Sequence, residues 1–89
     1  MKAIVTVMGL DRTGIIAKVS TCLSDFNINI LDINQTIMQD LFTMVMLVDI
    51  ENSKCDFASV SEELAKIGGE LGVEIRIQHE DIFNSMHKI

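Results

Sequence analysis

Apolar residues along this chain change their spacing several times, and each change marks the boundary of a predicted element. Residues 3–8 are rich in β-branched side chains and predict a strand. From Gly14 the apolar positions fall three or four residues apart, which predicts a helix that ends near residues 25–27. The buried face of this helix is predicted to carry Ile15, Val19, Cys22 and Phe26, widened by Ile16 and Leu23.

The rest of the chain predicts a hairpin, a second helix and a final strand. Segments 29–39 and 42–50 are predicted strands around the polar break at Gln39 and Asp40, and so short a connection implies an antiparallel pair. Residues 73–79 alternate between apolar and polar side chains, as a strand with one buried face does. Between the hairpin and this last strand, five apolar residues have helical spacing and predict the second helix: Phe57, Val60, Leu64, Ile67 and Leu71.

The predicted order is therefore β-α-β-β-α-β. Because such crossovers are right-handed, both helices lie on one face of a four-stranded antiparallel sheet, a ferredoxin-like α+β fold. The 89 residues form a single domain, with a core at about 1–80 and a C-terminal tail at 81–89. Ile82, Phe83 and Met86 have helical spacing, so we expect one or two helical turns that rest on an apolar surface.

The third predicted strand is apolar on both of its faces. Full burial of such side chains is worth roughly 1.5–3 kcal/mol each, so we expect both faces to be covered. A homodimer would achieve this, through sheet faces or through edge strands. The alternative is that the tail covers the second face of its own chain. One face carries Phe42, Met44, Met46, Val48 and Ile50, and the other carries Leu41, Val45 and Leu47.

Charge and composition exclude several classes of partner. The net charge is −6 and the seven basic residues are scattered singly, which argues against nucleic-acid and anionic-membrane surfaces. No apolar run is long enough to span a membrane. Cys22 and Cys55 lie far apart and no signal peptide precedes them, so we expect reduced thiols in a cytoplasmic protein.

The best-defined candidate site is the polar turn between the first strand and the first helix. Such a junction directs the unpaired N–H groups of a helix start at the turn, where they can bind a carboxylate or phosphate. We expect the N–H groups around Thr13 to Ile15 to hold a carboxylate and Asp11 to accept an ammonium group. The alternative is that Asp11 or Thr13 only caps the helix and that Gly14 is needed for tight packing. Asn29 either completes this polar pocket or simply begins its strand.

Catalysis and metal binding find little support in the residues. No nucleophile has a histidine in an activating sequence context, so we expect neither an enzyme nor a cofactor. His79, Glu80, Asp81 and His87 are the one cluster with metal-ligand chemistry, and their placement at the chain terminus favours a solvated tail. A metal protein built on the two histidines would have to carry metal at stoichiometric levels.

The element order, the turn Gly9-Leu10-Asp11-Arg12-Thr13-Gly14-Ile15-Ile16 and the segment Asn27-Ile28-Asn29-Ile30-Leu31-Asp32 together resemble the ACT domain family. Within it, the turn is most similar to ACT domains of the glycine-cleavage repressor and of formyltetrahydrofolate deformylase. The ending 74–83 resembles the stand-alone UPF0237 group. The resemblance implies a regulatory module that pairs into a dimer, often as one continuous sheet, and binds an amino acid at the interface.

By this resemblance the ligand-facing residues are Leu10, Asp11, Thr13, Gly14 and Asn29. Two positions depart from the family pattern: Gly9 stands where some serine-binding members have His, and Thr13 stands where Pro is often found. The identity of the amino acid therefore does not carry over. The rival hypothesis is a ligand-free module that docks a protein partner through its apolar sheet face.

Overall fold

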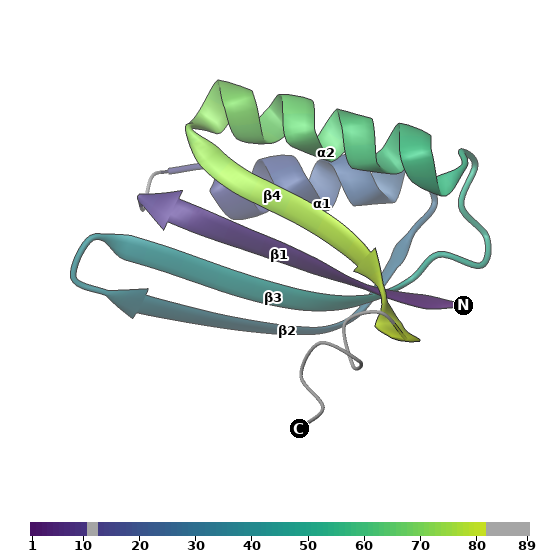
Figure 1. The fold of residues 1–89 in the computed structure, drawn as a ribbon, viewed down its shortest axis with the longest axis horizontal. Helices are drawn as coiled ribbons and strands as arrows, with labels where there is room; N and C mark the ends of the chain where they lie inside the picture. Colours follow the sequence, from purple (N-terminus) through teal and green to yellow (C-terminus); the bar gives the residue numbers. More distant parts are fainter. Residues whose placement is uncertain (11–12, 82–89) are drawn as a thin grey trace.

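The computed structural model describes residues 1–10 and 13–81. Two helices lie on one face of a four-stranded sheet, as the sequence predicts (Figure 1). The molecule is flat, with principal extents of 35 × 35 × 19 Å. The elements follow the predicted order: β1 (Lys2–Leu10), α1 (Ile15–Asp25), β2 (Asn29–Met38), β3 (Leu41–Asp49), α2 (Phe57–Leu71) and β4 (Val73–His79).

The strand order in the sheet is β2-β3-β1-β4, and every neighbouring pair is antiparallel. β1 pairs with β3 over nine residues, from Lys2 opposite Asp49 to Leu10 opposite Leu41. The predicted end of the first strand at residue 8 is therefore two residues too early, because the backbones of Gly9 and Leu10 continue the pairing. Since β1 and β2 both run antiparallel to β3, they point in the same direction.

One apolar layer fills the space between the sheet and the helices, and it includes Cys22 as predicted. The prediction for Ile16 is wrong, because this side chain is 39% exposed. Ile16 follows the buried Ile15 in the helix and so lies beside the face that packs on the sheet and not on it. The buried layer comprises Ala3, Val5, Val7, Ile15, Val19, Cys22, Leu23, Ile28, Phe42, Met44, Met46, Val48, Val60, Leu64, Ile67, Leu71, Val73, Ile75 and Ile77.

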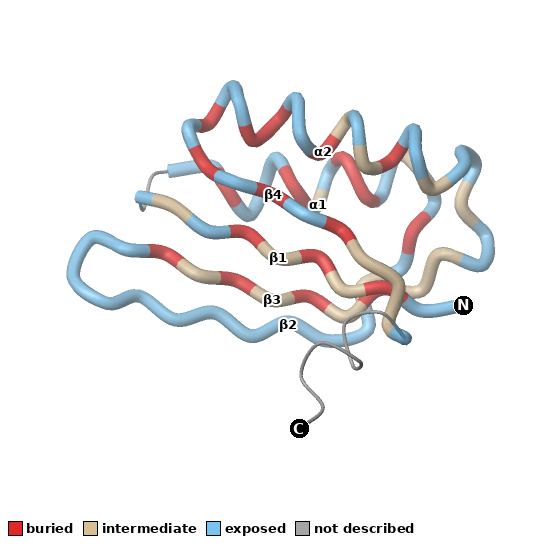
Figure 2. Tube along the Cα trace, in the orientation of Figure 1, coloured by how far each residue is buried: buried red, intermediate tan, exposed pale blue. Residues whose placement is uncertain are grey.

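Apart from the half-buried Ile30, every residue of the edge strand β2 is exposed, and most of its trace is pale blue (Figure 2). Ile33 and Ile37 are opposite Met46 and Phe42, two buried residues of β3, so they project from the helix side of the sheet. They are nevertheless 44% and 54% exposed. Two helices are too narrow a layer to cover the fourth strand.

The outer face of the sheet is apolar at its centre and polar along β4. Val45 and Leu47 are half-buried, and Leu41 is exposed. On β4, Arg76 donates a hydrogen bond from Nε to Glu74 Oε1 at 2.8 Å. The predicted cover for the second face of β3 is not provided by any described residue of the same chain.

Both ends of α2 have well-defined caps. The Asp56 carboxylate accepts a hydrogen bond from the Ser59 backbone N–H at 2.9 Å, and hydrogen bonds from Ser59 lower the pKa of Asp56. Gly72 adopts a left-handed conformation and donates its N–H to the Gly68 carbonyl, as the sequence predicts for a C-terminal glycine. Neither this helix nor α1 is long and apolar enough to cross a membrane, within the residues described.

Gly68 and Gly69 provide a matched test of how closely α2 approaches β4. A Cβ on Gly68 would lie 2.6 Å from the Val73 carbonyl oxygen, whereas a Cβ on Gly69 would meet nothing within 4 Å. We therefore expect Gly68→Ala to lower stability, because overpacking costs about 1–3 kcal/mol and outweighs the helix propensity of alanine. Gly69→Ala should raise stability by about 0.5–1 kcal/mol. Urea unfolding of both variants measures the difference, and equal effects would contradict the close approach.

Candidate functional site

The predicted binding turn lies where β1 ends and α1 begins. Leu10 is 67% exposed, and Thr13 and Gly14 are exposed as well, while the predicted ligand residue Asp11 lies outside the described residues. The N-cap of α1 is Gly14, which has no side chain to bond the first N–H groups of the helix. Lys18 N–H donates to the Gly14 carbonyl at 2.9 Å and closes the first turn. Capping by Thr13 is therefore not observed.

Backbone geometry explains two glycines at this turn. Gly14 has φ 93°, a left-handed conformation that costs other residues roughly 1–2 kcal/mol, and a Cβ there would meet no described atom within 4 Å. Conformation, and not tight packing, therefore requires glycine. At Gly9 the reason is different, because a Cβ would lie 2.8 Å from Val73 Cγ1. A larger side chain here, such as a histidine, would require Val73 to shift.

The structure does not bring Asn29 to this turn within one chain. Asn29 begins β2 opposite Asp49, whereas Leu10 ends β1 opposite Leu41. The eight steps along β3 between these pairs correspond to about 27 Å at roughly 3.3–3.4 Å per residue. Asn29 therefore lies at the opposite end of the sheet (Figure 1).

A cavity of about 460 Å³ lies at that opposite end, among residues that the sequence pattern did not select. Its floor is the buried pair Val60 and Ile77, where the first turn of α2 lies over β4. The rings of Phe57 and His79 also line it and are stacked, with centroids 4.3 Å apart and planes 15° apart. The remaining lining residues are Met1, Ile50, Glu51, Ser53 and Cys55.

The loop over this cavity is held by hydrogen bonds to the α1–β2 connection. Lys54 N–H donates to the Phe26 carbonyl at 2.9 Å, and Asn27 Nδ2 donates to the Asn52 carbonyl at 3.0 Å. Asn27 has a positive φ of 61°, a conformation that asparagine tolerates. The polar stretch at 52–54 predicted a turn here, but only the fold shows that this turn closes one side of a cavity.

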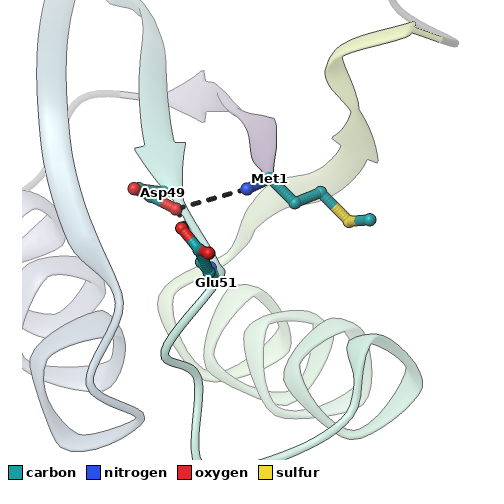
Figure 3. A network of polar contacts seen from close by, with 3 residues as sticks. All are labelled: Met1, Asp49 and Glu51. Atoms are coloured by element: carbon teal, nitrogen blue, oxygen red, sulfur yellow. Dashed lines mark hydrogen bonds and ion pairs between the residues drawn. The ribbon is translucent and has the colours of Figure 1, made fainter.

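The carboxylate of Asp49 organises the end of β3 beside the same cavity (Figure 3). Asp49 Oδ1 lies 3.7 Å from the Met1 ammonium nitrogen and accepts a hydrogen bond from the Glu51 backbone N–H at 3.0 Å. These contacts hold the backbone of Glu51 at the cavity rim.

The candidate metal cluster at the end of β4 is not assembled by the residues described. Within residues 1–10 and 13–81, no three His, Cys, Asp or Glu side chains converge as a metal site would require. His79 packs against Phe57, and its predicted companion His87 lies outside the described residues. The predicted helical turns of the tail, with Ile82, Phe83 and Met86, also lie outside the described residues, of which Asp81 is the last.

Comparison with known proteins identifies the class to which this fold and turn belong. The ACT domain family model matches residues 2–78. The chain is 58% identical over 88 residues to a UPF0237 protein of Methanocaldococcus jannaschii, covering 99% of this chain and 98% of that one. The chain therefore belongs to the ACT domain family.

Solved structures support the same assignment. An ACT domain protein from Streptococcus pneumoniae has a TM-score of 0.81 and 42% identity, over 93% of each chain. The ligand-free regulatory subunit of aspartate kinase from Thermus thermophilus has a TM-score of 0.66 and 29% identity, over 86% of this chain and 50% of that one. The family is one of regulatory small-molecule-binding modules.

The two cysteines should differ sharply in reactivity. Burial, followed by the charges of Glu63 and Asp25, raises the pKa of the Cys22 thiol to about 11, whereas Cys55 is exposed. At pH 8 we expect iodoacetamide to modify Cys55 and to spare Cys22 until denaturant is added. Mass spectrometry of the modified peptides measures this. Equal rates would contradict the burial of Cys22.

The same pKa shift predicts a pH dependence of stability. Above about pH 9 the unfolded chain loses the thiol proton of Cys22 while the folded chain retains it. The contribution of this thiol to the free energy of unfolding therefore falls as the pH rises from 9 to 11. Cys22→Ala serves as the control and should lack this component of the decline.

Proposed function

We propose that this protein is a homodimeric ACT module that senses a small amino acid at the subunit interface. The observation that carries the proposal is the start of α1 after Gly14, where no described side chain caps the helix and where Thr13 and Gly14 are exposed. The N–H groups of such a helix start suit a ligand carboxylate. In the proposed site Asp11 accepts the ligand ammonium, and Leu10 and Thr13 contact the ligand body. Cys22 and Cys55, both free thiols, are compatible with a reducing compartment such as the cytoplasm.

A two-fold axis beside β2 would supply Asn29 to this site from the second subunit. Within one chain, the start of β2 and the end of β1 are at opposite ends of the sheet. If β2 pairs antiparallel with β2 of a second subunit, the partner strand runs in the opposite direction. The partner copy of Asn29 then comes to the end of the sheet that carries Leu10 and Gly14. An interfacial site thus accounts for a pair of predicted residues that one chain keeps apart.

Exposed apolar side chains support this edge as the interface. Ser20 and Ser24 line a groove with Ile28, Asn29 and Ile30, so their side of α1 faces β2. Ile16 is four residues before Ser20 and shares that side of the helix. The exposed side chains of Ile16, Ile33 and Ile37 therefore form one apolar strip beside an unpaired strand edge. A second copy would cover both the strip and the edge.

The alternative is a ligand-free docking module that binds a protein partner through its outer sheet face. Met8 and Leu41 on this face are 45% and 46% exposed, next to half-buried Val45 and Leu47. A partner found in native lysate at stoichiometric amounts, and insensitive to amino acids, would favour this second function.

Thermal unfolding against each of the twenty amino acids tests the sensing function. A ligand at a hundred times its dissociation constant adds about 2.7 kcal/mol, which shifts the midpoint of a domain this small by several degrees. We expect one or two amino acids to raise the midpoint and Asp11→Ala to abolish the shift. Asp40→Ala, in the β2–β3 hairpin, is the matched control and should retain it. A flat panel would favour the docking function.

A mixed dimer tests whether the site is shared between subunits. Asp11→Ala and Asn29→Ala homodimers should each fail to bind the amino acid. A heterodimer of the two variants regains one intact site, formed by the turn of the Asn29→Ala chain and Asn29 of the Asp11→Ala chain. Titration calorimetry of differently tagged, co-expressed chains should give one site per dimer, against two for the wild type. No recovery of binding would contradict a shared site.

Two substitutions that each introduce a charge, compared by analytical ultracentrifugation, locate the dimer interface. Ile37→Glu should give monomers in analytical ultracentrifugation, because it places a charge in the strip beside β2. Met8→Glu lies on the outer sheet face and should leave the dimer intact. The reverse result would assign the dimer to the sheet face.

A further inference from the structure

We infer that the cavity between the start of α2 and the ends of β3 and β4 binds a small apolar amine. This site is separate from the proposed amino-acid site and does not depend on it. The turn at Leu10 and Gly14 is at the other end of β1 from the cavity.

The shape and lining of the cavity suit a compact apolar body. At about 460 Å³ it falls toward the lower end of the range for small-molecule sites, roughly 300–1,000 Å³. Val60 and Ile77 give it an apolar floor, and Phe57 and His79 give it an aromatic wall. A single ring or a branched aliphatic group would displace water from these surfaces without leaving a buried polar group unpaired.

The walls are held in place before any ligand binds. The Ser53 hydroxyl donates to the Cys55 carbonyl at 2.9 Å and accepts from the Cys55 backbone N–H at 3.3 Å. The bonds from Lys54 to Phe26 and from Asn27 to Asn52 attach the same loop to the α1–β2 connection. A preorganised cavity loses less conformational entropy when it binds a ligand.

The charges at the rim select a cation over an anion. Among the described residues that line the cavity, Glu51 is the one with a carboxylate side chain, and none is Lys or Arg. Met1 also lines the cavity, and its ammonium is paired with Asp49, whereas no ion pair joins Glu51 to another described residue (Figure 3). Among these residues a ligand carboxylate would meet only an ammonium that Asp49 already pairs, whereas an amine can approach the unpaired Glu51. The preferred class is therefore an amine without a carboxylate.

Three probes that share a phenylethyl group test this with the full-length protein: 2-phenylethylamine, 2-phenylethanol and 3-phenylpropionate. In ¹H–¹⁵N NMR titrations we expect the amine to shift the amide signals of Cys55, Phe57, Val60, Ile77 and His79 saturably. The signals of Thr13 and Gly14 should not move. Because an exposed ion pair is weak, the amine should bind about two- to five-fold more tightly than the alcohol. The carboxylate should bind most weakly.

Glu51→Gln should remove the advantage of the amine over the alcohol. Glu62→Gln, on the exposed side of α2, is the matched control and should preserve it. As a second readout, 2-phenylethylamine should slow the modification of Cys55 by iodoacetamide, since this thiol lines the cavity. Equal binding of amine and carboxylate, an unaffected Glu51→Gln variant, or signal shifts confined to the turn would each overturn the proposal. None of these results bears on the amino-acid panel.

Discussion

The pairing of β1 with β3 is the constraint on which the rest of the structure depends. Its nine residue pairs set the register of the central strands and so determine which side chains enter the apolar layer. These pairs also determine which strand ends lie at the same edge of the sheet. Since β3 is antiparallel to both β1 and β2, the turn after β1 and the start of β2 are at opposite ends of the sheet. A ligand site that uses both must therefore involve two subunits.

The second constraint is the width of the helical layer. α2 packs over β4 through Gly68, which brings the helix within contact of the Val73 backbone. α1 then covers the middle of the sheet and leaves Ile33 and Ile37 of β2 exposed. Because these two side chains are already about half buried, completing their burial in a dimer would contribute roughly 1.5–3 kcal/mol per subunit before the cost of association. The exposed edge is therefore a place where association would remove apolar surface from water.

Sequence patterns predicted the fold well because the apolar spacing here follows the burial of each element. The alternation through Val73, Ile75 and Ile77 matches the buried face of β4. The predicted burial of Ile16 was wrong, because helical periodicity shows that a face is apolar but not whether another element covers it. The sequence of the turn was enough to locate that part of the candidate site. The separation between the turn and Asn29 could not be predicted from it, because this separation depends on the order of the strands in the sheet. The cavity near Cys55 and His79 could not be predicted, because its residues come from four separate segments.

The loop at 50–56 connects the cavity with the start of β2. Its hydrogen bonds reach Phe26 and Asn27, immediately before Asn29 begins β2. Because these bonds hold the loop in place, a ligand in the cavity would affect Asn29, which the proposed amino-acid site receives from its partner subunit, only by displacing the loop. Any such coupling must be reciprocal, so a saturating amino acid would change the affinity of the cavity for an amine by the factor that the amine imposes in return. Unchanged affinities in both directions would show that the loop holds the two regions together without linking their ligands.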